Sequence, residues 1–174
     1  MPKTIALIAA FLMTALVWGG DARAQLPGDD SHIQLKHIMA PSLVKPGSPA
    51  TRIRPLTPIM TVPKAEDVPF VCQRAPRAAE AILNYFYKNP APVTKKGELD
   101  VKTLDDNHRL VAAHVNRAFG KPIVSEVYFI EGGKSFGSGM MGRLPFAQSQ
   151  GCGRVMEEYE KRLKEALGEG EGGQ

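Results

Sequence analysis

The first 24 residues of the chain have the pattern of a secretory signal, and this feature decides which residues can contribute to a fold. Residues 5–18 form an apolar run with no charged side chain. Ala22 and Ala24 then match the small residues that signal peptidase requires before its cleavage site. The run is about 14 residues long, shorter than the roughly 20 that a membrane-spanning helix needs. We therefore expect a periplasmic or secreted chain that begins at Gln25; retention of the run as an uncleaved anchor is the alternative.

The remaining chain suits a single domain. The sequence is 43% hydrophobic and 23% charged, a composition that allows a core to form and argues against wholesale disorder. The net charge of +4 is too small and too dispersed to indicate nucleic-acid binding. We expect a flexible N-terminus over residues 25–31, one domain over residues 32–167, and a disordered tail over residues 168–174.

An N-terminal hairpin is the first element that the pattern predicts. Residues 33–39 alternate with a period of two, which indicates a strand, and Pro41 is expected to end it. A turn rich in proline and glycine follows. Residues 52–62 form the second arm, but Pro55 and Pro58 interrupt it. Because proline cannot donate to a ladder, this arm is expected to be an edge strand at best.

Two amphipathic helices follow. The first begins near Val71 or Pro76, and prolines at positions 90 and 92 end it. The second has its apolar stripe between Leu104 and Phe119, with Thr103 and Asp106 as a capping box. Gly120 should end this second helix.

The remaining elements complete an α+β fold. Residues 124–130 alternate as a third strand. Residues 154–167 carry an apolar stripe and three supportive acid–base pairs at four-residue spacing, which predicts a C-terminal helix. The expected architecture is a small antiparallel sheet of about three strands packed with two helices, plus this C-terminal helix.

The two cysteines, Cys72 and Cys152, are expected to pair. An oxidising compartment favours a disulfide between two exported thiols. The enclosed loop is long, so the bond would stabilise the fold by about 4 kcal/mol in the loop-entropy description. Two separate thiols are the alternative interpretation.

A loop rich in glycine and methionine, residues 132–142, separates the third strand from the C-terminal helix. If it is exposed, it offers an adaptable contact surface for a partner protein; if it is packed, it covers the body. The possible contact residues are Phe136, Met140, Met141, Arg143 and Phe146.

No motif predicts catalytic residues, a metal site or a cofactor. Gly133-Lys134-Ser135 lacks the upstream glycine of a phosphate-binding loop, since Tyr128 occupies that position. His108 and His114 are six residues apart on the second helix and therefore lie on different faces. Asp105 and Asp106 suit the first turn of a helix without any acid–base chemistry.

Three short motifs resemble the periplasmic domain of the flagellar basal-body FliL family. Residues 74–83 are similar to that family's P-x-I-x-D-A-I-L helix, and residues 110–119, with Asn116, are similar to its I-N-x-x-L helix. Residues 124–129 match its V-x-x-V-Y-F strand. The resemblance covers roughly residues 68–130. It implies a non-enzymatic protein that assembles around the flagellar motor and supports its stators.

The sequence therefore predicts a non-enzymatic exported accessory protein that docks on a protein partner in a membrane-associated or flagellar assembly, with only indirect membrane contact. No nucleic acid or cofactor is expected. The alternative function is an exported small-ligand-binding protein or a hydrolase-like enzyme that uses residues 132–142 beside Arg143.

Overall fold

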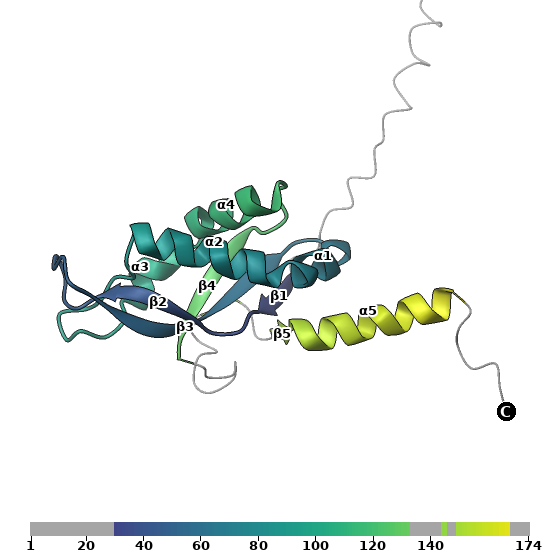
Figure 1. The fold of residues 1–174 in the computed structure, drawn as a ribbon, viewed down its shortest axis with the longest axis horizontal. Helices are drawn as coiled ribbons and strands as arrows, with labels where there is room; N and C mark the ends of the chain where they lie inside the picture. Colours follow the sequence, from purple (N-terminus) through teal and green to yellow (C-terminus); the bar gives the residue numbers. More distant parts are fainter. Residues whose placement is uncertain (1–29, 133–143, 146–148, 168–174) are drawn as a thin grey trace, which may run out of the picture.

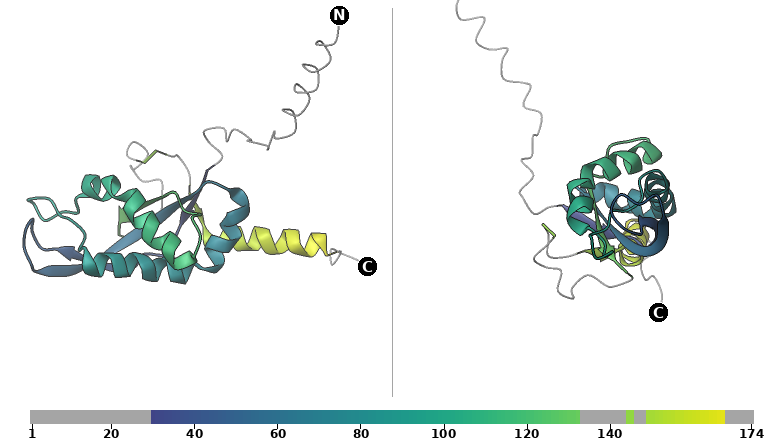
Figure 2. Two further views of the ribbon diagram at one scale, coloured as in Figure 1. Left: turned by 90° about the horizontal axis from the view of Figure 1, so that it is seen from above. Right: turned by 90° about the vertical axis from the view of Figure 1, so that its left-hand side faces the viewer.

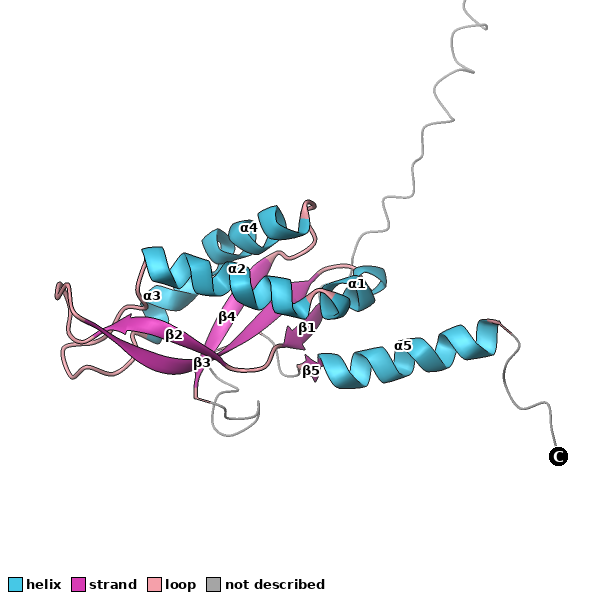
Figure 3. Ribbon diagram, viewed as in Figure 1, coloured by secondary structure: helices cyan, strands magenta, loops and turns pink. Residues whose placement is uncertain are grey.

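The computed structural model describes residues 30–132, 144–145 and 149–167. Helices cover one face of a twisted, mostly antiparallel sheet (Figures 1 and 3). The strands are β1 (Ser31–Gln34), β2 (Ile38–Leu43), β3 (Thr51–Val62), β4 (Glu126–Glu131) and β5 (Gln150–Gly151). The helices are η1 (Ala65–Asp67), α1 (Val68–Gln73), α2 (Ala75–Lys88), α3 (Val101–Asp106), α4 (His108–Phe119) and α5 (Cys152–Ala166). The α+β class is confirmed, and the sheet has five strands, more than predicted.

The predicted hairpin is present, but its irregular arm is the first one. Strands β1 and β2 both pair antiparallel with β3. The register shifts by one residue between them, so residues 35–37 face only residues 57–58, as in a β-bulge. The Leu35 amide donates to the Pro58 carbonyl at 2.9 Å across this bulge. The strand also begins at Ser31, one residue before the expected domain boundary.

Strand β3 is central, which corrects the prediction of an edge strand. It pairs with β1 and β2 on one side and with β4 on the other. In an extended strand the nitrogen and the carbonyl of one residue point the same way. The Pro58 carbonyl faces the bulge, and the Pro55 carbonyl accepts from the Gly132 amide, just beyond the end of β4. Each proline therefore lacks an N–H group at a place where the ladder is already interrupted, Pro58 at the bulge and Pro55 beyond the end of β4.

Pro41 does not end the first arm either. It lies within β2 and its carbonyl accepts a hydrogen bond of 2.9 Å from the Ala91 amide on the outer edge. Its nitrogen therefore also faces this edge, where the segment after α2 makes only an isolated bridge with the strand.

The two main helices lie over the apolar face of the sheet. Helix α2 buries Ile82 and Phe86, and α4 buries Val111, Val115 and Phe119 of its predicted apolar stripe. The Phe86 and Phe129 rings meet edge to face with their centroids 5.1 Å apart, which joins α2 to β4.

The helix ends agree with the predictions in part. Gly120 ends α4 with a φ of 77°, in the left-handed region that favours glycine. The prediction that Thr103 caps the helix is wrong. Asp100 is the capping residue, because its carboxylate accepts a hydrogen bond from the Thr103 amide. The predicted second helix is also divided at Asn107 into α3 and α4.

The opposite face of the sheet carries a smaller apolar cluster. Ile59, Tyr128 and Ile130 are buried there together with Leu144. Leu144 thus packs on the body. Helix α5 leaves the body beside β5 and extends away from it (Figures 1 and 2).

Candidate functional site

Helix α5 is attached to the body at its first turns only. It follows β5, which pairs in parallel with β1 at Ile33 and Gln34. Val155 is the one buried residue of the helix, and Met156 packs partly against the core. The rest of the helix extends past the end of the body (Figure 2). The described chain therefore leaves most of this helix without a packing partner.

A disulfide fastens the start of α5 to α1. Cys72 and Cys152 are bonded with their Cα atoms 5.2 Å apart, which confirms the predicted pair. Cys72 is 7% exposed and belongs to the main core, so the anchor point is itself rigid. The bond encloses a separation of 80 residues, for which loop entropy gives a stabilisation of about 4 kcal/mol.

The apolar stripe of α5 is exposed. Tyr159 is 37% exposed, Leu163 is 47% and Leu167 is 66%, so exposure rises steadily away from the body. We call these three residues the α5 stripe. Apolar side chains that gather on one exposed helix face are typical of a protein-interaction surface.

A shallow groove of about 210 Å³ runs between α1 and the base of α5. Val68, Pro69 and Val155 line its apolar part, and Glu158 and Arg162 line its charged part. Tyr159 also lines it, so the groove continues into the α5 stripe. We call it the α1–α5 groove.

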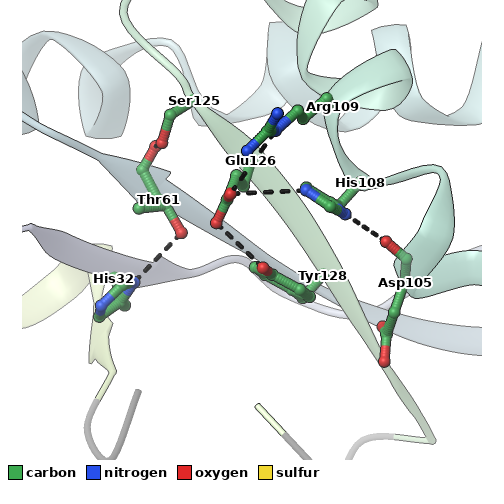
Figure 4. Close-up of polar contacts among 8 residues, drawn as sticks. All are labelled: His32, Thr61, Asp105, His108, Arg109, Ser125, Glu126 and Tyr128. Atoms are coloured by element: carbon green, nitrogen blue, oxygen red, sulfur yellow. Dashed lines mark hydrogen bonds and ion pairs between the residues drawn. The ribbon is translucent and has the colours of Figure 1, made fainter. Parts of the chain in front are cut away.

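A second cluster, of polar residues, lies around Glu126 on β4 (Figure 4). The Tyr128 hydroxyl donates to Glu126 Oε2 at 3.0 Å, and His108 Nε2 lies 3.4 Å from Glu126 Oε1. Arg109 Nε lies 3.9 Å from the same oxygen. The His108 and Tyr128 rings stack with their centroids 5.3 Å apart. Residues from the junction of α3 and α4 are thus fastened to the edge strand.

The surroundings of His108 show what this cluster can do chemically. One ring nitrogen faces the Asp105 carbonyl, and the other faces the Glu126 carboxylate. The ring therefore lies between two oxygen acceptors, one from each element. The Ser125 hydroxyl donates to the Thr61 carbonyl at 3.2 Å. The contacts of His108 fasten the junction of α3 and α4 to β4.

Tyr128 is held in its neutral form. Burial raises its pKa above the usual 10, and the hydrogen bond to Glu126 and the charge of that carboxylate raise it further. A phenol with a raised pKa supplies no phenolate at neutral pH, so its contribution is a hydrogen bond.

His32 lies on β1 near the same cluster (Figure 4). Its Nδ1 is 3.2 Å from the Thr61 hydroxyl. Burial lowers the pKa of His32, while the charges of Asp30 and Glu126 act in the opposite direction.

The structure brings together only one predicted pair of site residues, Cys72 and Cys152. The five proposed contact residues, Phe136, Met140, Met141, Arg143 and Phe146, lie outside the described residues. The Glu126 cluster was missed, because its members come from three elements and share no spacing motif. The alternation of Glu126, Tyr128 and Ile130 on one face of β4 was its one signal in the sequence.

Within residues 30–132, 144–145 and 149–167, no three metal-binding side chains gather closely enough to hold an ion. The same ranges contain no helix with the length and apolar character needed to cross a bilayer. Comparisons of the chain with known protein families, curated proteins and solved structures found no match.

Proposed function

We propose that this chain is a non-enzymatic exported accessory protein that docks on a membrane-associated assembly. The flagellar motor is the assembly that the resemblance of residues 68–130 implies. In this proposal the signal is cleaved after Ala24 and the protein acts in the periplasm. The contact with the membrane is indirect, through protein partners.

A single observation carries the proposal: α5 is fastened covalently to the body and yet exposes its apolar stripe. A helix that served only the stability of this chain would turn Tyr159 and Leu163 to the core, as α4 turns Val111 and Val115. A projecting helix with an open apolar face is suited to binding another protein.

Two further features support the proposal. The disulfide is of the kind that persists in oxidising compartments. The groups around Glu126 contact one another, so they are accounted for by the attachment of α4 to β4. The residues proposed from the sequence, Phe136 to Phe146, would add to the docking surface.

Fractionation of cells that export the chain tests this function. We expect the wild-type protein to sediment with membranes and to be released by a mild detergent together with its partner assembly. Leu163→Glu should shift it to the soluble fraction. Leu110→Glu is the matched control, since Leu110 on α4 is 51% exposed and Leu163 is 47%. A wild-type protein that is fully soluble without detergent would refute the proposal.

A further inference from the structure

We infer that α5 pairs with α5 of a second copy of this chain in an antiparallel, two-fold symmetric dimer. The inference rests on the proposed function, because it names the first partner of the docking helix. In this arrangement the second copy covers the α5 stripe, and a membrane-associated assembly would be bound by the pair of helices rather than by one.

The spacing of the apolar residues on α5 suits a helix pair. Met156, Tyr159, Leu163 and Ala166 follow one another at intervals of three, four and three, the spacing of the inner positions of a two-helix seam. Most of this seam is open, since Tyr159 and Leu163 are 37% and 47% exposed. A second helix along it would cover the α5 stripe.

The charges of α5 identify the chemistry of that second helix. Between Arg154 and Glu165, the acidic residues Glu157, Glu158 and Glu160 come first, and the basic residues Lys161, Arg162 and Lys164 follow directly. A complementary helix must be basic along the first part and acidic along the second. The same helix in the reverse direction meets this requirement, whereas a parallel copy would place like charges side by side.

One register satisfies both the apolar and the charged residues. If Tyr159 of one copy lies level with Leu163 of the other, then Glu158 lies level with Lys164, and Glu160 with Arg162. Two like-charge pairs are the exceptions: Glu157 lies level with Glu165, and Lys161 lies level with Lys161 of the other copy, on the helix face opposite the seam. Glu165 is offset by Lys161, whose Nζ is 4.0 Å away in the same helix.

The same register brings the exposed end of the second helix to the level of the α1–α5 groove. Leu167, 66% exposed, lies level with Val155 of the other copy, and Val155 lines the groove with Val68 and Pro69. Two-fold symmetry repeats this arrangement at the other copy.

Sedimentation of the purified, processed protein tests the dimer. We expect a concentration-dependent dimer for the wild type, loss of the dimer species for Leu163→Glu, and a wild-type dimer for the matched control Leu110→Glu. Far-UV circular dichroism should show that both variants stay folded. A wild-type protein that is monomeric at every concentration would overturn the inference.

Cysteine crosslinking tests the direction of the pair. A mixture of Tyr159→Cys and Leu163→Cys chains should give more oxidised dimer than either variant alone, because these positions face each other only in the antiparallel register. Equal or stronger crosslinking within each single variant would contradict this arrangement. These measurements use purified protein. A monomer that still sediments with membranes in cells would refute the dimer and leave the docking function standing, and a soluble dimer would do the reverse.

Discussion

Helices α4 and α5 both carry an apolar stripe along one side, yet the two stripes meet different surroundings. Helix α4 buries four residues between α2 and β4, whereas α5 buries Val155 alone. The helical period reports that one face is apolar. It does not show whether the same chain covers that face. The comparison of α4 with α5 shows that coverage depends on where the preceding segment places the helix.

The two helices are also held by different forces. Packing against the sheet and α2 holds α4 along its whole length. Helix α5 depends on one disulfide, on Val155 and on the short pairing of β5 with β1. An isolated helix of about 15 residues is marginal in water, so this single anchorage decides whether α5 keeps its place and its fold.

The largest expected effect on stability comes from a charge placed on the buried stripe of α4, compared with the same change on the α5 stripe. Val115→Glu places a carboxylate at a position that is 0% exposed, and it should lower the free energy of unfolding by about 4 kcal/mol or more. Leu163→Glu on the α5 stripe should change it by less than about 0.5 kcal/mol. Urea denaturation at concentrations where the chain is monomeric measures both values. Equal losses would show that α5 is packed as tightly as α4.

Removal of the disulfide should have the next largest effect. The double variant Cys72→Ala, Cys152→Ala should lose about 2–4 kcal/mol in guanidinium denaturation. Circular dichroism should still show a folded body, with a loss of helix confined to α5.

Limited proteolysis locates this change. In the double variant we expect new cleavage within residues 152–167, while the body over residues 30–132 stays resistant. Thiol titration of the denatured, unreduced wild type should find no free cysteine. Unchanged protease sensitivity would mean that noncovalent contacts hold α5 without the bond.

The elements of the fold could be predicted because their periods are local. The helical stripe of Val111, Val115 and Phe119 and the alternation in β4 needed no knowledge of the rest of the chain. The place of β3 could not be predicted. A proline excludes pairing only on the side that its nitrogen faces, and that side depends on the bulge at residues 35–37, which only the paired structure shows.

The candidate site, like the fold, could be predicted from the sequence only in part. The disulfide followed from the number of cysteines and the expected compartment. The exposure of Tyr159 and Leu163 did not follow, because an uncovered stripe and a buried one have the same sequence pattern. The contact of His108 with Glu126 depends on where the junction of α3 and α4 meets the edge of β4, and no short-range pattern encodes this meeting.

Within the body, the Glu126 cluster should contribute less to the free energy of unfolding than the core does. Glu126→Gln keeps an acceptor for the Tyr128 hydroxyl but removes the charge that faces His108. We expect a loss of about 1 kcal/mol in urea denaturation, since the carboxylate is partly exposed and its ion pair is screened. Arg109→Gln is the control: this side chain is 81% exposed and should change the stability by less than about 0.5 kcal/mol. A control that matches the loss of Glu126→Gln would show that Arg109, and not His108, is the important partner.

The smallest expected effect is a dependence on pH at His32, beside the same cluster. Burial lowers the pKa of His32 below its ordinary value of 6.5, so the folded chain binds fewer protons than the unfolded chain just below that pH. The free energy of unfolding should therefore fall as the pH drops through 6.5, and the decrease should stop once the folded form is also protonated.

His32→Gln removes this dependence, and His37→Gln, at an exposed position of the bulge, serves as the matched control. Denaturation curves across this range should show the wild type and His37→Gln losing stability relative to His32→Gln as the solution becomes more acidic. Parallel pH profiles for all three proteins would show that the pairing of His32 with Thr61 tolerates the protonated ring, and that this side of the sheet is as open to water as the α5 stripe.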